Sequence, residues 1–563
     1  MSLPRLAAFY WPRLRAADRD DVRAAGMGHG LDPEGITITP LMDMVLGFLY
    51  QSIPRPPVSA SASLSAAAAT GDGGGDDRIS LLPDDILRAV VSRLPAKDGA
   101  RTAVLSSRWR RLWRSTPLVL VDTHLLPRRG GGRPARAGAA SRAVADAVSR
   151  VLEAHPGPFP FVSLSCSFIG DDAQRGVAAR WLDLLAAKGV EHLVFVNRPC
   201  PLPGVTLPAA LFNCSSLRRL YIGSWELPDT ASIPLPRAAA AAAFPNLREL
   251  VLGCVVMVDG DLPFLLAASP ALETLAVFGI LNTLRARLSS GSLRCAQFCL
   301  SFMEEVAVLD APHLERLFLW RNIKNTRVKI GHAPQLRMLG YLQPGVHQLE
   351  IGNTIIKART IVRPGTTVPS VNMLALHLHF GVRNEVKMLP SFLRCFPNVE
   401  TLCIEVESNP PFPALVVSSI IITALHQIVA SVLHSALLSE EAPGRTSNID
   451  VNFWQEAGPI ECVQSHLKMM ILREFQGEES ELSFLKFVGE NARVLEKMVI
   501  VMKLGRYSAP EEVAAKVMDL QSAKWAREGN KLGFLISRLR AGGSAWSLRD
   551  GTDLSCDDPF MCL

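Results

Sequence analysis

The most regular feature of the chain is a hydrophobic pattern that returns from about residue 160 onwards. In each copy, two residues separate the first apolar position from the second, and one residue separates the second from the third. Alternate residues of a strand point to the same side, so each copy predicts one short strand with its apolar residues facing a core. Nine copies follow one another, with steps of mostly 21 to 30 residues: Val190-Leu193-Phe195, Leu217-Leu220-Ile222, Leu247-Leu250-Leu252, Leu272-Leu275-Val277, Leu293-Ala296-Phe298, Leu314-Leu317-Leu319, Leu336-Leu339-Tyr341, Val371-Leu374-Leu376 and Val399-Leu402-Ile404.

A series with this period is typical of leucine-rich repeats, in which a helix or turn follows each strand. We therefore predict an α/β fold, with an irregular repeat solenoid over residues 160–409. The step from Leu336 to Val371 is 35 residues and contains an out-of-phase copy, Val346-Leu349-Ile351, which we ascribe to an irregular turn.

Two later copies, Leu467-Met470-Leu472 and Leu495-Met498-Ile500, predict the last repeats within residues 446–505. We expect their strands to continue the sheet, next to the strand of Leu402. Residues 506–563 are expected to form a C-terminal helix and tail.

Before the repeats, residues 77–126 have the pattern of three short helices. Pro83 suits a first helical turn, and Asp84 and Asp85 follow it where the positive end of a helix favours carboxylates. Apolar residues then recur at helical spacing until Pro95. Asp98 and Ser106 are candidate caps of the second and third helices. Three helices in so few residues cannot close a core alone, so part of their apolar surface should be buried against another protein.

The sequence ISLLPDDILRAVVSRLPAKDGARTAVLSSRWRRLW in this segment resembles an F-box. The resemblance implies docking on a Skp-type adaptor and, through it, on a cullin in a ubiquitin ligase. Gly99 departs from the pattern, where a bulkier residue is usual. The positions that the resemblance assigns to adaptor binding are Leu82, Pro83, Ile86, Leu87, Val104, Leu105, Trp109 and Trp113.

A second resemblance covers the C-terminal part. HLKMMILREFQGEESELSFLKFVGENARVLEKMVI is similar to the FBD domain, and the ending LSCDDPFMCL also looks like that of a plant family that combines F-box, leucine-rich repeats and FBD. The resemblance implies a non-catalytic subunit that recognises a protein substrate through its repeats.

Three stretches do not fit either pattern. Residues 1–76 are an N-terminal extension that ends in a Pro-, Ser-, Ala- and Gly-rich linker, and residues 127–159 contain a second linker and a helix. We expect this second linker to uncouple the F-box from the repeats. Residues 410–445 are an apolar insertion; Ala414 to Leu438 has no charged residue and is long enough to span a bilayer. Because it interrupts a repeat array, an inserted helix that packs on the repeats, or translated non-coding sequence, is favoured.

Composition adds mainly exclusions. The net charge of +6 over 563 residues is small for a nucleic-acid-binding protein. The 11 cysteines form no CxxC pair, and we interpret them as reduced apolar fillers. An N-terminal region broken up by charges does not look like a secretory signal. We expect a cytoplasmic or nuclear protein with no metal, cofactor or membrane span.

No motif of an enzyme site was found: there is no phosphate-binding loop, no HExxH and no GxSxG. The main alternative to a ubiquitin-ligase receptor is a repeat scaffold with no ubiquitin role. A small-molecule receptor is a further alternative, because some plant F-box repeat proteins bind hormones, although the aliphatic, irregular strands do not favour it.

Overall fold

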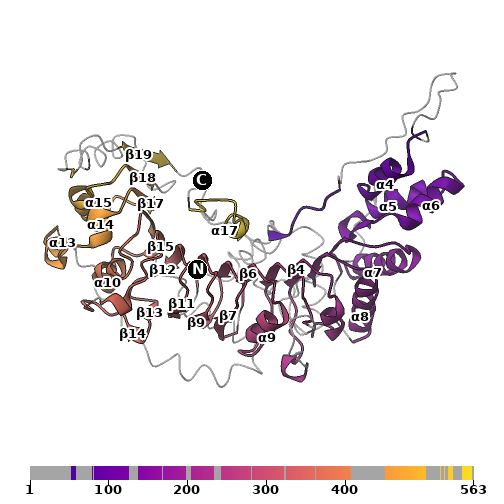
Figure 1. Ribbon diagram of the computed structural model, residues 1–563, viewed down its shortest axis with the longest axis horizontal. Coiled ribbons are helices and arrows are strands. Elements are labelled where there is room, and N and C mark those ends of the chain that lie inside the picture. Colours follow the sequence, from indigo (N-terminus) through magenta and orange to yellow (C-terminus); the bar gives the residue numbers. More distant parts are fainter. Residues whose placement is uncertain are drawn as a thin grey trace. The chain divides into compact units, whose positions relative to one another are not determined.

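The computed structural model describes residues 52–58, 79, 81–125, 137–167, 169–170, 172–197, 205–233, 242–280, 282–322, 325–361, 363–406, 451–502, 520, 525–526, 531–536 and 548–560. These residues belong to two compact units, Met1–Asn282 and Thr283–Leu563. Figure 1 labels many of their elements.

The described part of the first unit contains a helical module followed by a short strand. The module consists of α4 (Asp84–Ser92), α5 (Ala96–Thr102) and α6 (Ser107–Ser115), and then come β1 (Val119–Val121), the 3-10 helix η2 (Asp122–Leu125) and α7 (Ala137–Ala154). Five further strands follow: β2 (Phe161–Leu164), β3 (His192–Val196), β4 (Arg219–Gly223), β5 (Glu249–Gly253) and β6 (Thr274–Phe278). Strands β1 to β6 pair in chain order, all parallel.

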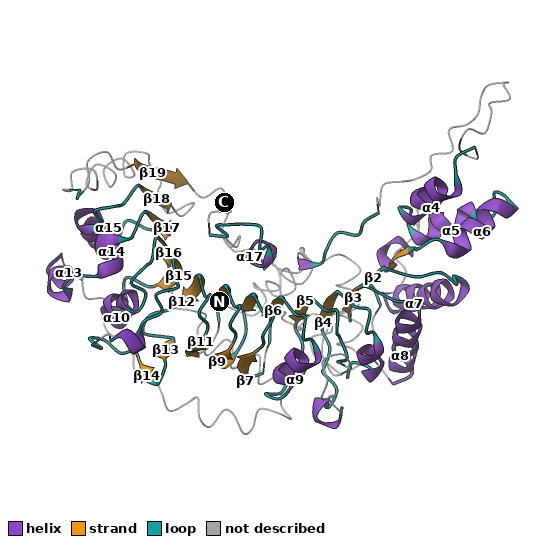
Figure 2. Ribbon diagram, in the orientation of Figure 1, coloured by secondary structure: helices purple, strands orange, loops and turns teal. Residues whose placement is uncertain are grey.

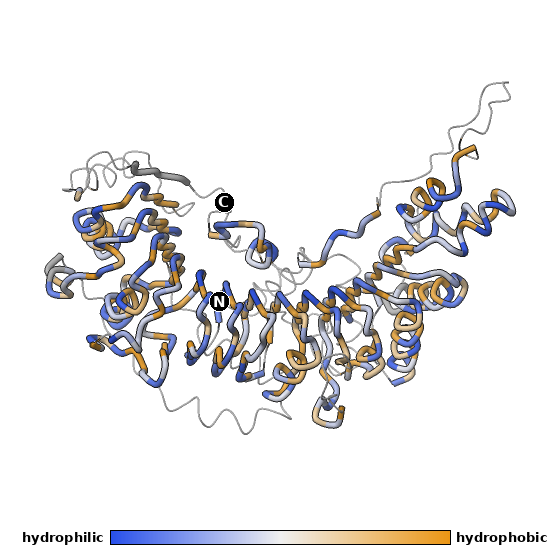
Figure 3. Tube along the Cα trace, viewed as in Figure 1, coloured by the Kyte–Doolittle hydropathy of each residue, from blue (hydrophilic) through white to orange (hydrophobic). Residues whose placement is uncertain are grey.

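The connections of the first unit pack on one side of this sheet. They include α8 (Asp172–Ala187), the 3-10 helices η3 (Ala209–Asn213) and η4 (Thr230–Ser232), and α9 (Asp261–Ala268). Figure 3 shows that α9 is hydrophobic over most of its length, and Leu262, Leu265 and Leu266 on it are buried.

The register of the strands confirms the predicted repeat pattern. Leu193 pairs with Leu220, Leu220 with Leu250, and Leu250 with Leu275. All four side chains are fully buried. The equivalent position of the hydrophobic pattern therefore forms one continuous apolar row through the first unit, as in a stack of repeats.

The second unit contains a larger parallel sheet. Its strands are β8 (Cys295–Cys299), β10 (Arg316–Trp320), β12 (Met338–Leu342), β15 (Met373–Leu378), β16 (Thr401–Val406), β17 (Met469–Phe475), β18 (Lys497–Met502) and β19 (Lys531–Ile536), in this order. The α-helices in the described part of this unit are α10 (Arg383–Arg394), α13 (Val451–Ala457), α14 (Glu461–Ser465), α15 (Glu479–Asn491) and α17 (Leu548–Thr552).

The FBD-like segment continues this sheet, as predicted. β16 and β17 are parallel neighbours, with Leu402 opposite Met470 and Ile404 opposite Leu472. β17 in turn pairs with β18, with Leu472 opposite Ile500. The terminal repeats are therefore structural equivalents of the preceding ones.

A second sheet of five strands explains the irregular step in the sequence. Its order is β14 (Thr354–Ile355), β13 (Gln348–Ile351), β11 (Arg327–His332), β9 (Met303–Asp310) and β7 (Leu284–Ser289). In these repeats the returning segment is a strand and not a helix. The out-of-phase copy falls on β13, where Leu349 and Ile351 are buried. The expectation of an irregular turn was wrong, because this copy belongs to another sheet.

The end of several strands has a conformation that the hydrophobic pattern did not predict. Ser224, Cys254 and Leu300 directly follow β4, β5 and β8, and each has a positive φ, between 51° and 58°. Their N–H groups donate to carbonyl oxygens of the neighbouring repeat, each at 2.9 Å. Non-glycine residues rarely adopt this conformation, and here the hydrogen bond to the next repeat stabilises it.

The described cysteines of the repeats are fillers of the core. All nine described cysteines are free, and eight of them are buried. Burial raises the pKa of the Cys254, Cys395 and Cys403 thiols to about 12. Within the described ranges, no cluster of His, Cys, Asp and Glu side chains is arranged to hold a metal ion.

The apolar insertion lies outside the described residues, so its predicted packing stays a prediction. None of the helices in the part of the chain that the structure describes is long and apolar enough to cross a membrane. What the structure does give is the pairing on either side of the insertion: β16 ends at Val406 and lies directly beside β17.

Deletion of residues 410–443 is therefore expected to leave the fold intact. The pairing of Leu402 with Met470 needs only an ordinary repeat connection between the two strands. A thermal unfolding curve of the deletion protein should show one transition within a few degrees of the parent. Loss of soluble protein would show that the insertion contributes to the core.

Candidate functional site

The first helix of the module has two apolar sides. Leu87 and Val91, four residues apart, are buried, while Ile86 and Val90 are 49% and 43% exposed. Pro83 is the N-cap residue of α4 and so lies directly before the first helical turn, which the sequence pattern predicts for it. The helix therefore packs one apolar row inside the module and presents a second one outwards.

The third helix packs Trp109 towards the inside of the module. Ser106 caps α6 as predicted, because its side chain accepts a hydrogen bond from the Trp109 N–H at 3.3 Å. Trp109 and Leu112 are buried. Asp98 does not cap the second helix: α5 begins at Ala96 after Pro95, and Asp98 instead forms an ion pair with Arg101 at 2.9 Å.

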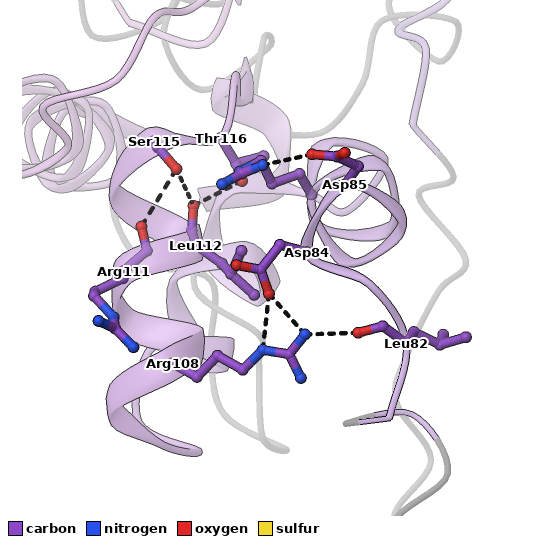
Figure 4. A network of polar contacts seen from close by, with 9 residues as sticks. Leu82, Asp84, Asp85, Arg108, Arg111, Leu112, Ser115 and Thr116 are labelled. Atoms are coloured by element: carbon purple, nitrogen blue, oxygen red, sulfur yellow. Dashed lines mark hydrogen bonds and ion pairs between the residues drawn. The ribbon is translucent and has the colours of Figure 1, made fainter.

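Arg108 links the starts of the first and third helices (Figure 4). Its Nε donates to Asp84 Oδ1 at 2.8 Å, and its Nη2 donates to the Leu82 carbonyl at 2.6 Å. The sequence did not indicate this role, because charged residues beside tryptophans are typical of a solvated helix side. Arg110, Arg111 and Arg114 do lie exposed. The Arg108 contacts hold the segment around Leu82 against α6.

Exposed apolar side chains gather on the module. Of the twelve large apolar side chains that are exposed in the described ranges, seven lie between Ile79 and Leu105. We call these seven the outer surface: Ile79 (59% exposed), Leu81 (78%), Leu82 (37%), Ile86 (49%), Val90 (43%), Val104 (80%) and Leu105 (66%). Clustered exposed apolar residues mark a site of protein contact more specifically than scattered ones.

The structure divides the residues that the resemblance assigned to adaptor binding. The exposed ones are Leu82, Pro83, Ile86, Val104 and Leu105. The other three residues do not belong to the outer surface. Leu87 and Trp109 are buried inside the module, and the centroid of the Trp113 ring lies 5.0 Å from that of the His155 ring.

The module is joined to the repeats by main-chain pairing. β1 is a parallel neighbour of β2, with Leu120 opposite Val162, and the Leu118 N–H donates to the Pro158 carbonyl at 3.1 Å. The buried carboxylate of Asp122 accepts hydrogen bonds from the N–H groups of Ser165 and Cys166, both at 2.6 Å. The expectation that a linker uncouples the two parts was wrong, because the end of the module is the first strand of the sheet.

A glycine lies where the second helix meets this junction. Gly99 is buried in α5, and a Cβ built on it would lie 3.3 Å from Leu118 Cδ2 and 3.8 Å from Val91 Cγ1. Gly99, which departs from the F-box pattern, therefore allows α5 to pack closely on Leu118, the residue before β1. A bulkier side chain would require Leu118 to move.

His155, directly after α7, contacts the residues that lead from α6 into β1. Its Nε2 lies 3.0 Å from the Thr116 carbonyl oxygen, and its ring contacts Trp113 and Phe159. Burial lowers the pKa of His155 to about 4, against the hydrogen bond to Thr116, which raises it. The imidazole is thus neutral at physiological pH and donates from Nε2 to the carbonyl.

Comparison with known proteins agrees with this architecture. The F-box domain matches residues 79–120, the LRR repeats of the FBD-associated F-box protein At5g56370 match residues 178–404, and FBD matches residues 455–500. The chain belongs to the plant F-box/LRR-repeat proteins with an FBD domain.

The chain is also similar to F-box proteins of Arabidopsis thaliana. The FBD-associated F-box protein At5g22720 is 23% identical, over 78% of this chain and 90% of its own length. The F-box/FBD/LRR-repeat protein At5g22670 is 26% identical, over 65% of this chain and 86% of its own. The F-box/LRR-repeat protein At3g26922 is 30% identical, over 37% and 61%. The F-box match of this F-box/LRR/FBD protein ends at residue 120, within β1.

Protonation of His155 is expected to loosen the junction. The unfolded chain has the ordinary pKa of 6.5 at this residue and takes up the proton first, so the stability contributed by neutral His155 is complete above about pH 6.5 and is lost down to about pH 4. Melting temperatures of the parent and of His155→Gln, at about pH 7.5 and about pH 5, test this. The parent should lose more stability on acidification than the variant.

The matched control is His332→Gln, since His332 is an exposed residue paired with Asp310. This change should leave the parent's loss on acidification in place. The same loss in the parent and in His155→Gln would show that another group is responsible.

Proposed function

We propose that this F-box/LRR/FBD protein is the substrate-recognition subunit of a Skp-cullin-F-box type ubiquitin ligase. The F-box binds a Skp-type adaptor, and the repeats bind a protein substrate. The observation that carries the proposal is the outer surface, where seven exposed apolar side chains gather on a module that buries Leu87, Val91, Trp109 and Leu112. An F-box match at residues 79–120 supports the adaptor as the partner that covers it.

The adaptor-binding residues take different roles in this proposal. Leu82, Pro83, Ile86, Val104 and Leu105 touch the adaptor. Leu87 and Trp109 hold the helices from inside, and Arg108 fixes the Leu82 segment through its bond to the Leu82 carbonyl. Trp113 acts at the junction with the repeats.

In this proposal the receptor positions the substrate and takes no part in bond formation. A ubiquitin-carrying enzyme supplies the reaction, and bringing a substrate lysine near it raises the effective concentration. A flexible linker between the F-box and the repeats would lower this effective concentration. The β1–β2 pairing and the Asp122 hydrogen bonds instead tie the F-box to the repeats of the first unit.

Changing Leu82 and Pro83 together to Ala is expected to abolish co-purification with a Skp-type adaptor. Central apolar anchors of an interface commonly contribute about 2 kcal/mol each, which is roughly thirtyfold in affinity. The melting temperature should change little, because both side chains are exposed. Arg110→Ala with Arg111→Ala is the control, since exposed charges contribute little. Binding that survives the Leu82 and Pro83 changes would refute the assigned surface.

Leu105→Ala tests the other end of the outer surface. Leu105 precedes α6 and is 66% exposed. Adaptor affinity, measured by calorimetry, should fall roughly tenfold or more. Val258→Ala, at a residue that is 67% exposed but lies in the repeats, should leave the affinity unchanged. Equal effects of the two changes would contradict the localisation.

The scaffold alternative differs in one measurable property. A folded parent protein that binds no Skp-type adaptor would exclude the ligase role, and the chain would then act as a repeat scaffold.

A further inference from the structure

The C-terminal segment lies on the strands of the second unit. α17 and the residues after it, Leu548–Phe560, are found on the side of the sheet opposite α10, α14 and α15 (Figure 2). We call these residues the tail. Its partners are side chains that point out of β8, β10, β12 and β17 on that side, and we call this side the inner surface: Gln297, Arg316, Phe318, Tyr341 and Arg473.

The polar contacts of the tail use its main chain. Arg316 donates from Nη1 to the carbonyl oxygens of Gly551 (3.4 Å) and Asp553 (2.9 Å), and from Nη2 to those of Leu554 (3.5 Å) and Cys556 (2.6 Å). The Gln297 amide donates to the Leu548 carbonyl at 3.2 Å. At the far end, Arg473 donates to the Phe560 carbonyl. Any peptide with a similar path offers such acceptors.

One aromatic side chain anchors the end of the tail. Phe560 is 1% exposed, and its ring meets the rings of Phe318 and Tyr341 edge-on, with centroids 5.7 Å apart in both pairs. Pro559 beside it is also buried, whereas Asp553, Ser555 and Asp557 are exposed. The tail is therefore held at its two ends and along Arg316.

Charge adds a second element of recognition. The tail carries Asp550, Asp553, Asp557 and Asp558, and the inner surface offers Arg316 and Arg473. Hydrogen bonds from Ser555 and, less strongly, the charges of Arg316 and Arg549 lower the pKa of Asp553, so this carboxyl is ionised. The carboxylate of the inner-surface neighbour Glu405 is already paired with His377 (3.3 Å) and Arg321 (3.0 Å).

We propose that the inner surface of the second unit is a peptide-binding site, occupied in cis by the tail, which a substrate segment of the same chemistry displaces. That segment is acidic, follows a path that offers carbonyl oxygens to Arg316, and ends in an aromatic residue between Phe318 and Tyr341. The proposal rests on the proposed function, since it specifies which peptide the receptor recognises. A tethered tail competes at an effective concentration in the millimolar range, so it raises the threshold for substrates.

The test uses a fluorescent peptide of residues 548–560 with Cys556→Ser, measured by anisotropy against the chain lacking residues 547–563 and against the full chain. The truncated chain should bind it, and the full chain should bind at least tenfold more weakly. Arg316→Gln in the truncated chain should reduce binding at least tenfold. Arg294→Gln, at a half-exposed arginine paired with Glu315, is the control and should have no effect.

Two altered peptides test the recognition itself. Phe560→Ala, and lysine at all four aspartate positions, should each remove most of the binding. Equal affinity of truncated and full chains, or a folded truncated chain that binds no peptide, would overturn the proposal.

A second measurement keeps the test decisive if truncation prevents folding. The Cys295 thiol lies beneath the tail, 3.5 Å from the Gly551 carbonyl oxygen, and burial raises its pKa to about 12. Phe560→Ala in the full chain should speed maleimide labelling of Cys295 at least tenfold. Cys214 in the first unit, whose pKa burial also raises to about 12, is the matched control and should keep its rate. An unchanged Cys295 rate would show that the tail is a permanent cover.

These outcomes are independent of the adaptor. Failure of tail exchange with normal adaptor binding would refute only the peptide site. Tail exchange in a protein that binds no adaptor would leave the peptide site and refute the ligase role.

Discussion

The pairing of β1 with β2 is the interaction on which the functional geometry depends. Three short helices bury Leu87, Trp109 and Leu112 between them, but they are too few to form an independent core. By ending in a strand of the repeat sheet, the module gains main-chain hydrogen bonds and the contact of Trp113 with His155. The residues left over on its other side form the outer surface, which remains available to a partner.

A related constraint governs the inner surface of the second unit. A guanidinium taken out of water is costly unless its hydrogen bonds are made, and Arg316 makes its bonds to tail carbonyls. These acceptors are not specific to the tail, because water or another peptide provides equivalent ones. The hydrogen-bonding capacity of Arg316 is therefore used when the tail is bound, but another peptide could use it equally well. Specificity then comes from the contacts of Phe560 with the rings of Phe318 and Tyr341 and from the acidic side chains of the tail.

Local patterns in the sequence predicted the elements well and their partners poorly. The spacing around Leu193, Leu220 and Leu250 is periodic, so the strands and their register followed from it. The second sheet was missed because alternation in Leu284, Ala286 and Leu288 is short and resembles any exposed strand. The Arg316 contacts join residues more than 230 positions apart, and nothing near Arg316 in the sequence indicates them. For the candidate site, the F-box signature located the module, but only packing distinguishes exposed Leu82 from buried Leu87.

The central claim is that the outer surface, and not the buried side of the module, receives the adaptor. Hydrogen–deuterium exchange of the full chain, with and without a Skp-type adaptor, tests this most directly. We expect added protection at residues 81–90 and 103–106, and unchanged exchange in β1 and β2, which are already paired. Protection confined to the repeats, or exchange in β1 and β2 that rises on adaptor binding, would contradict it.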